Sequence, residues 1–244
     1  MREGSGDRRS VRSSCRTDDV RQHVRSRLRS CGRRNAVATA VATSHSLAGE
    51  SHAIVTRMGT RMLILVRHGQ YYSDEDHLRY GALTPAGREQ ARRTAKRLAE
   101  YPVDIVHVST MPRAIETARL IRQRVGRVPV RPSHLLREGI PMWAPGLTAL
   151  HRANMSRTRK RIDRAFARYF RPTRGADSCE VLVCHGNITR YLLRVAIGDP
   201  PSRWWRYWPL HCSLSIVVVP SDAPTRIVSI NDVGHLPRRL QTVS

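Results

Sequence analysis

The sequence predicts an α/β fold, a three-layer sandwich in which a mainly parallel central sheet carries helices on both faces. A continuous apolar run at residues 62–66, and a strand-length run at 180–184 that is apolar after Glu180, are typical of buried parallel strands. Segments with apolar residues at helical spacing alternate with these runs, and this alternation is the pattern of a sheet covered by crossover helices. The length of 244 residues is sufficient for one such domain and a tail.

Residues 1–60 differ in composition from the remainder. They contain twelve arginines and many serines but no sustained apolar periodicity, which predicts a disordered tail. Three origins compete: a transit-type leader, a basic interaction arm, or a start codon placed too early, with Met58 or Met62 as the true beginning. We favour the third, place the folded domain at residues 61–244, and expect residues 1–57 to be dispensable.

The first half of the domain is predicted to contain three strands and two helices. The strands are residues 62–66, 104–108 and 128–130. Thr84 and Pro85 begin the first helix, because threonine is a good N-cap and proline is favoured in the first turn. The apolar positions of the two helices are Ala91, Ala95, Leu98 and Ala99, then Ala114, Ala118, Ile121 and Val125.

The second half begins with a proline-rich loop at residues 132–145. Residues 147–170 are predicted to be mostly helical and residues 188–197 to form another helix, with a strand at 180–184 between them. Residues 214–219 and 226–230 complete the sheet. In the long helix, one side is apolar, and the opposite side is predicted to be a solvated arginine row of Arg157, Arg161, Arg164 and Arg168.

Two segments share one design, a buried strand that ends in His-Gly. One strand runs into Arg67-His68-Gly69 and the other into Cys184-His185-Gly186. Parallel strands end at the same edge of a sheet, where ligands bind in such folds, so both histidines are expected at that edge. Glycine lets the chain turn there and lets a ligand approach the backbone. The repeated pattern favours a functional role for both histidines over a structural one.

Two further segments add polar candidates. Residues 109–117 follow the second strand directly, so the first turn of their helix would face the same edge. Free N–H groups at a helix start attract anions, and the guanidinium of Arg113 matches phosphate oxygens bidentately. Glu138 lies in a loop, in the run Leu-Arg-Glu-Gly. Taken alone, Arg113 would be interpreted as a solvated helix arginine, and nothing local excludes a surface position for Glu138.

Taken in order, these motifs resemble those of the histidine phosphatase (phosphoglycerate mutase-like) superfamily. They occupy residues 67–69, 83–87 with 90–91, 109–117, 136–139 and 184–187, and the resemblance extends from about residue 62 to at least 219. The branch most similar is the mitochondrial serine/threonine protein phosphatases, on residues 70–71, 113–117, 135–141 and 188–191. We see neither the anchoring helix nor the Trp/Asp multimerisation motif of that branch in residues 1–60, and do not expect its localisation or large assemblies here.

The resemblance implies a metal-independent phosphomonoesterase that needs no cofactor. His68 would be the nucleophile that accepts the phosphoryl group as a phosphohistidine. Arg67, Arg113 and His185 would surround the phosphoryl oxygens. Glu138 would protonate the leaving alkoxide and then activate water.

The same resemblance leaves the substrate open. Gln70, Gly186 and Asn187 would add hydrogen bonds to the phosphate or the substrate. The branch favours a phosphoprotein with phosphoserine or phosphothreonine. A phosphoglycerate mutase-type phosphotransferase and a small-molecule phosphatase are the alternatives, and the short loop after His68 favours hydrolysis. A non-catalytic nucleic-acid-binding protein is disfavoured, because a binder has no use for this set of side chains.

The composition limits the kinds of partner and the surroundings that we expect for this protein. The formal net charge is +24, and only Lys96 and Lys160 of 43 basic residues are lysines, but the arginines are spread along the chain, so nucleic acid is not expected as a partner. No apolar run approaches the roughly 20 residues of a membrane span. Five cysteines without CxxC pairing suit a reducing cytoplasm. The aromatic residues 204–208 are interpreted as loop packing, and a homodimer is left open.

Overall fold

The computed structural model describes residues 58–73 and 81–243. The predicted tail therefore lies outside the described residues, except for its last three positions. Met58 and Gly59 form β1 (Met58–Gly59), which pairs with β5 (Thr173–Arg174) ahead of the predicted domain start at residue 61. The boundary between tail and domain otherwise stays a prediction.

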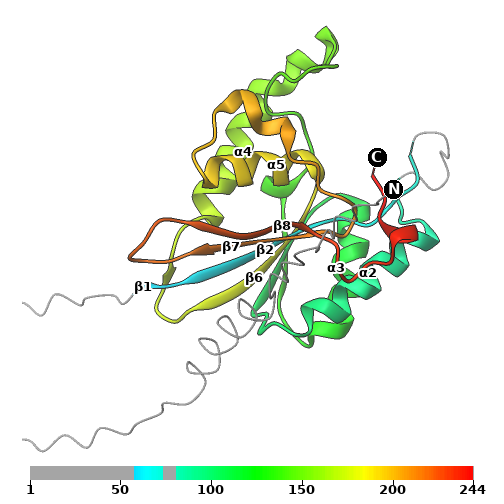
Figure 1. Cartoon of the computed structure of the whole chain (residues 1–244), viewed down its shortest axis with the longest axis vertical. Coiled ribbons are helices and arrows are strands. Elements are labelled where there is room, and N and C mark those ends of the chain that lie inside the picture. The colour runs from blue at the N-terminus through cyan, green and yellow to red at the C-terminus, as the bar shows by residue number, and fades with distance from the viewer. Residues whose placement is uncertain (1–57, 74–80, 244) are drawn as a thin grey trace, which may run out of the picture. The chain divides into compact units, whose positions relative to one another are not determined.

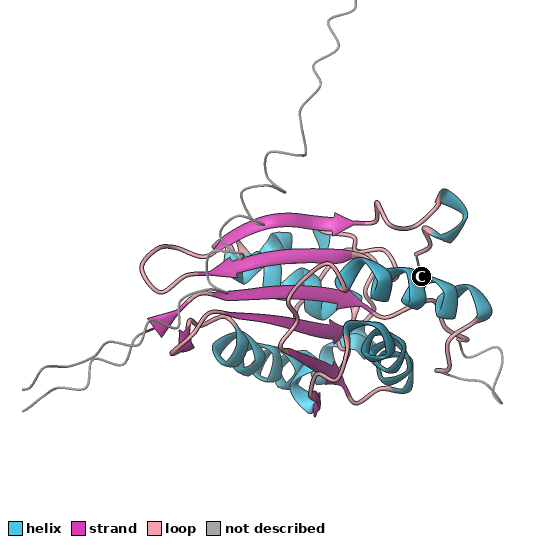
Figure 2. Ribbon diagram, turned by 90° about the horizontal axis from the view of Figure 1, so that it is seen from below, coloured by secondary structure: helices cyan, strands magenta, loops and turns pink. Residues whose placement is uncertain are grey.

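The central sheet has six strands in the order β4-β3-β6-β2-β7-β8. The first four run parallel to one another and are β4 (Val130–Ser133), β3 (Ile105–Ser109), β6 (Ser178–Cys184) and β2 (Arg61–Arg67). β7 (Leu214–Val219) is antiparallel to β2, and β8 (Arg226–Asp232) is antiparallel to β7. Figure 2 shows these strands side by side with helices beside them, so the predicted, mainly parallel sheet is confirmed.

Helices cover the two faces of this sheet in pairs (Figure 1). α2 (Pro85–Leu98) and α3 (Pro112–Val125) pack together on one face, and α4 (Met155–Tyr169) and α5 (Gly186–Ala196) cover the other. Short 3-10 helices occupy the connections: η1 (His134–Leu136), η2 (Ala149–Asn154), η3 (Pro201–Arg206) and η4 (Arg238–Leu240). The predicted three-layer sandwich is confirmed.

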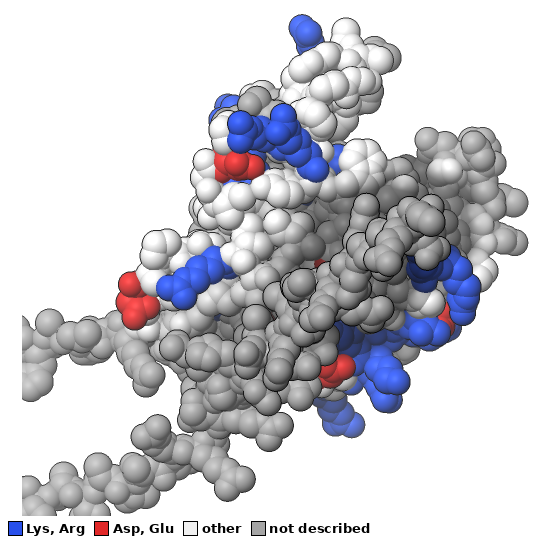
Figure 3. Space-filling view, viewed as in Figure 1, with Lys and Arg blue, Asp and Glu red and all other residues white. Residues whose placement is uncertain are grey.

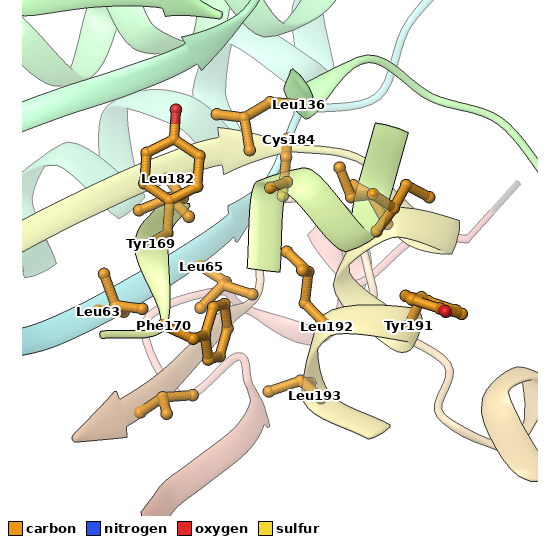
Figure 4. Packing of buried hydrophobic residues seen from close by; sticks show 14 of the residues in the cluster. Leu63, Leu65, Leu136, Tyr169, Phe170, Leu182, Cys184, Tyr191, Leu192 and Leu193 are labelled. Carbon is orange, nitrogen blue, oxygen red and sulfur yellow. The ribbon is translucent and has the colours of Figure 1, made fainter. Parts of the chain in front are cut away.

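β2 is a continuous apolar run because side chains on both of its faces are buried in the core. Leu63 and Leu65 face the cluster under α4 and α5, together with Leu182 of β6 and Leu192 of α5 (Figure 4). Ile64 and Val66 are equally buried although they are not part of this cluster, so β2 is buried on both faces. Each such side chain contributes about 1.5–3 kcal/mol by leaving water. This burial holds the end of β2, and the residue after it, in one place.

Three predicted boundaries are corrected. β4 begins at Val130 and runs through Pro132, because β4 is an edge strand where proline costs no ladder hydrogen bond. Regular α-helix in the 147–170 segment begins only at Met155, after η2. Ala99 is exposed at the C-cap of α2 instead of joining its apolar face, since the helix ends at Leu98.

The close approach of the chain after His68 to α2 explains the glycine in the Leu-Thr-Pro-Ala-Gly motif. Thr84 caps α2 by accepting a hydrogen bond from the Gly87 N–H at 3.0 Å. A Cβ on Gly87 would lie 1.9 Å from the carbonyl oxygen of Gln70. Alanine is normally the better helix former, so the clash reverses the usual sign of a glycine-to-alanine change.

We expect Gly87→Ala to lower the free energy of unfolding by about 1–3 kcal/mol, the usual cost of overpacking. Denaturant titration measures this. Gly234→Ala is the matched control, because its Cβ would meet only the Asp232 side chain, at 3.3 Å. A stabilised Gly87→Ala protein would show that residues 69–70 move away from α2 at little cost.

Candidate active site

The two strand-end histidines are neighbours, as predicted. β2 and β6 pair in parallel with Arg67 opposite Cys184, and the His68 N–H donates to the Cys184 carbonyl at 3.0 Å. The ring centroids of His68 and His185 lie 4.9 Å apart, and both side chains are buried. The parallel register of the two apolar strands is therefore what brings the histidines together.

His68 is held as a neutral imidazole with a lone pair on Nε2. Its Nδ1 lies 2.8 Å from the Gly69 carbonyl oxygen, which can only accept, so Nδ1 carries the proton. Nε2 accepts a hydrogen bond from Nε of Arg113 at 3.0 Å. Burial, followed by the nearby His185 and Arg113, holds the pKa of His68 well below its usual range. A neutral ring with this lone pair is a competent nucleophile.

Arg113 reaches His68 from the first turn of α3. Its guanidinium lies 4.4 Å from the ring centroid of Tyr71 and is buried. One turn later, Thr117 Oγ1 accepts a hydrogen bond from the Gly69 N–H at 3.1 Å and donates to the Arg113 carbonyl at 2.7 Å. Thr117 therefore links α3 to the chain after β2. Arg113 is positioned both by this link and by its contact with the ring of Tyr71.

Arg67 and His185 complete the buried polar group. Nη1 of Arg67 donates to the Pro209 carbonyl at 2.7 Å, and burial lowers the pKa of Arg67 to about 10, which leaves it charged at neutral pH. Nε2 of His185 lies 2.7 Å from the Ser109 hydroxyl, and its Nδ1 has no hydrogen-bond partner among the described residues. Burial, Arg113 and Arg67 keep the pKa of His185 well below its usual range. Two cations and a neutral histidine thus surround His68.

Glu138 lies in the loop after η1, at the same edge of the sheet. Its Oε1 accepts from the Gly139 N–H at 2.9 Å and its Oε2 from the Asn187 N–H at 3.4 Å. Burial raises the pKa of Glu138, although both backbone N–H groups and the two buried arginines act in the opposite direction. A carboxyl with a raised pKa is suited to donate a proton near neutral pH.

Arg161 on α4 holds this loop, a contact that the sequence analysis missed. Its Nη1 donates to the carbonyls of Leu135 at 2.9 Å and Arg137 at 2.6 Å, and its Nη2 to that of Glu138 at 3.2 Å. The prediction of a solvated arginine row is therefore wrong for Arg161, which is half-buried, and right for the other three, which are exposed. Helical periodicity assigns a residue to a face of the helix but does not show which loop folds onto that face.

The predicted substrate-binding residues occupy the rim of this group. Gln70 is tied to α2, because its Oε1 accepts from the Thr84 hydroxyl at 2.9 Å. Oδ1 of Asn187 accepts a hydrogen bond from Nη1 of Arg190 at 3.3 Å. Gly186 packs against Arg67, because a Cβ placed on Gly186 would lie 3.6 Å from Cζ of the Arg67 guanidinium. Contacts of these three residues with a substrate stay a prediction.

The aromatic residues 204–208 divide into two kinds. Trp204 is buried and donates from Nε1 to the Trp143 carbonyl at 3.1 Å, which agrees with the packing interpretation. Trp208 is 51% exposed and lies under the guanidinium of Arg190, 4.1 Å from the ring centroid.

In the view of Figure 3, Lys and Arg side chains gather on the side of α4 and on the side of α2 and α3. Within residues 58–73 and 81–243, no helix is sufficiently long and apolar to cross a membrane. In the same residues, no three His, Cys, Asp or Glu side chains are grouped so that they could hold a metal ion.

Comparison with solved structures gives the fold class first. A phosphoglycerate mutase from Plasmodium falciparum aligns with a TM-score of 0.53 at 27% identity, over 76% of this chain and 98% of that one. A putative alpha-ribazole-5'-P phosphatase from Escherichia coli aligns with a TM-score of 0.57 at 21% identity, over 70% and 96%. The protein therefore has a phosphoglycerate mutase-like fold.

Sequence comparison then gives the family. The model of the histidine phosphatase superfamily (branch 1) matches residues 63–149 and 142–233, and the chain belongs to this superfamily. It is 34% identical over 191 residues to serine/threonine-protein phosphatase PGAM5, mitochondrial, of Xenopus tropicalis, covering 73% of this chain and 66% of the relative. The Homo sapiens protein of the same name is 33% identical over 192 residues, covering 73% and 64%. The chain thus spans about two thirds of the length of these relatives. The predicted resemblance is confirmed, as is assignment to a family of phosphatases.

The predicted cytoplasmic location is contradicted, because these relatives are named mitochondrial. The prediction depended on cysteine usage, and the described cysteines Cys179, Cys184 and Cys212 are indeed free and buried. Free thiols indicate reducing surroundings only, and they do not distinguish one reducing compartment from another.

Proposed function

We propose that the chain is a metal-independent phosphatase that hydrolyses phosphomonoesters through a phosphohistidine at His68. The observation that carries the proposal is the neutral, buried His68, with its Nε2 lone pair directed at Arg113. The proximity of His68 to His185 and Arg113, and of Glu138 to Arg113 and Arg67, supports the proposal. Proteins with phosphoserine or phosphothreonine are the proposed substrates, supported by the names of the relatives.

In the first step, Nε2 of His68 attacks phosphorus. The new N–P bond forms as the P–O bond to the substrate breaks, and the departing alkoxide takes a proton from Glu138. Arg113 exchanges its hydrogen bond with Nε2 for one with a phosphoryl oxygen, because the lone pair that it met is now in the N–P bond. Arg67 and Arg113 neutralise the charge of the equatorial oxygens, which is where most of the catalysis in phosphoryl transfer originates.

In the second step, the Glu138 carboxylate removes a proton from water, and the resulting hydroxide attacks phosphorus. The N–P bond breaks, inorganic phosphate leaves, and His68 returns to its neutral form with Nδ1 still bonded to Gly69. Glu138 is protonated again and ready for the next cycle.

A substrate screen of the purified full chain in EDTA tests this proposal. We expect phosphate release from phosphoserine and phosphothreonine peptides at a higher kcat/KM than from phosphosugars or 3-phosphoglycerate, and no effect of the chelator. Activity that EDTA removes and a divalent cation restores would contradict metal independence. Transfer of phosphate between positions of 3-phosphoglycerate, without release, would favour a mutase-type phosphotransferase instead.

Arg161 supplies a test of the loop that holds Glu138. Arg161→Met keeps much of the side-chain length but removes the four hydrogen bonds to the loop carbonyls. Misplacing a catalytic group by about 1 Å costs up to about 100-fold, so we expect kcat to fall by about 10-fold to 100-fold on alkyl phosphates. Arg164→Met, an exposed position on the same helix, is the control. An equal loss on aryl phosphates would show that Arg161 does not act through Glu138.

A further inference from the structure

A third buried histidine, His211, lies beside the nucleophile without a role in the steps above. Its side chain is 1% exposed, and its ring centroid is 5.6 Å from that of His68. It stands in the turn between η3 and β7, and this turn is bonded to the end of β2 on both sides of His211. Arg67 donates to the Pro209 carbonyl at 2.7 Å, and the Cys212 N–H donates to the Arg67 carbonyl at 2.9 Å. The backbone therefore fixes His211 against the end of β2 that carries His68.

The hydrogen-bond chain behind His211 bears on its tautomer. Nε2 of Gln90 donates to the Leu240 carbonyl and to the Thr242 hydroxyl oxygen, both at 2.8 Å, and this orientation is fixed because a carbonyl can only accept. The Thr242 hydroxyl is thus an acceptor toward Gln90. Its own hydrogen is available to Nδ1 of His211, 2.9 Å away, while the Thr242 backbone carbonyl interacts with the same ring and raises the pKa of His211. We infer that the hydroxyl donates to Nδ1, and nitrogen-15 NMR decides between the two tautomers. With Nδ1 accepting, the proton of the neutral ring is on Nε2.

This Nε2–H has no hydrogen-bond partner within residues 58–73 and 81–243. Burial, followed by the charge of Arg67, lowers the pKa of His211 to about 3, so the ring is neutral at physiological pH and offers one donor only. A buried N–H without an acceptor is costly in a folded protein. His185, which also lies beside His68, likewise has a ring nitrogen, Nδ1, without a described partner.

We propose that Nε2–H of His211 donates a hydrogen bond to a phosphoryl oxygen of the substrate and of phosphorylated His68. Thr242, in the segment after η4, and Gln90, on α2, are then positioning residues that orient the ring. The inference depends on the proposed function, since the anion that His211 binds is the phosphoryl group being transferred. It adds a fifth phosphoryl-facing side chain beyond His68, Arg67, Arg113 and His185.

Kinetics of His211 variants test the role. His211→Phe keeps a ring of similar size and removes the donor, so we expect kcat/KM on phosphopeptides to fall by about 10-fold to 100-fold, below the full loss of an oxyanion-hole donor. Inhibition by inorganic phosphate should weaken in parallel. His211→Gln places an amide N–H near Nε2 and should recover most of the loss. His107→Gln, which changes a buried histidine bonded to Glu180 outside the site, is the control. Unchanged kinetics and phosphate inhibition in a folded His211→Phe protein would overturn the proposal.

Nitrogen-15 NMR of the histidine side chains decides the question without turnover. We expect the Nε2–H tautomer for His211 in the free protein and a shift of its resonances on addition of inorganic phosphate. Thr242→Val should weaken the tautomer preference, and Thr242→Ser should keep it. A dominant Nδ1–H form, or resonances unmoved by saturating phosphate, would overturn the proposal. If the wild-type chain hydrolyses no phosphomonoester at all, the proposed function fails, while the phosphate titration still decides the role of His211.

Discussion

His68→Ala is expected to lower turnover by about 10⁴-fold or more, the scale seen when a covalent nucleophile is removed. The reason is that the lone pair on Nε2 is the group that bonds to phosphorus, and the neighbouring His185 has its Nε2 engaged with the Ser109 hydroxyl at 2.7 Å. Initial rates on a phosphopeptide measure the loss. His68→Asn is the matched variant, because an asparagine amide still donates toward the Gly69 carbonyl and so preserves the local hydrogen bond.

Trapping the covalent intermediate is a second test of the role of His68. Quenching the wild-type reaction with alkali should trap phosphate on the protein that is stable to alkali and labile to acid, as expected of phosphohistidine. Neither His68 variant should carry it. Label that survives acid, or that maps to a serine or cysteine, would refute the proposed chemistry even if both variants were inactive.

The parts of the site that could be predicted are those that strand ends define. His68 and His185 each follow an apolar run that is typical of a strand buried on both faces in a parallel sheet, and this pattern predicts the edge at which the two histidines meet. Arg113 follows by the same reasoning, since its helix begins directly after β3. Glu138 is different, because only the family resemblance distinguished it from a surface acid.

The parts that could not be predicted depend on contacts between distant segments. The helical pattern alone predicts a solvated side chain for Arg161. Its guanidinium has four carbonyl acceptors only because the loop at residues 134–138 folds onto the helix. His211 lies in a turn without a strand-end pattern, and the residue that orients it, Thr242, comes from the end of the chain. Hydrophobic periodicity describes one helix or strand at a time. Contacts between distant segments, such as that of His211 with Thr242, form only when the elements pack together.

Glu138→Gln is expected to lower kcat/KM for alkyl phosphates by about 100-fold to 10,000-fold, the usual value of general acid catalysis. kcat/KM reports the steps up to formation of phosphohistidine, so the later role of Glu138 with water does not enter it. Aryl phosphates such as p-nitrophenyl phosphate should lose much less, because their leaving group departs without a proton. The variant should also release p-nitrophenolate in a burst followed by slow turnover, since the second step lacks its base. Glu89→Gln, at a partly exposed position of α2 where the carboxylate pairs with Arg93, is the control.

The pH profile of kcat/KM separates an acid role for Glu138 from a structural one. His68 is neutral above its lowered pKa, which places the acid limb of the alkyl-phosphate profile at low pH. Glu138 is protonated below its raised pKa, so activity falls on the alkaline side as its proton is lost. Glutamine cannot ionise, and the alkaline limb should therefore flatten in Glu138→Gln while the acid limb stays in place. Equal losses for alkyl and aryl substrates, with both limbs unchanged, would show that Glu138 only holds the N–H of Asn187 beside the site.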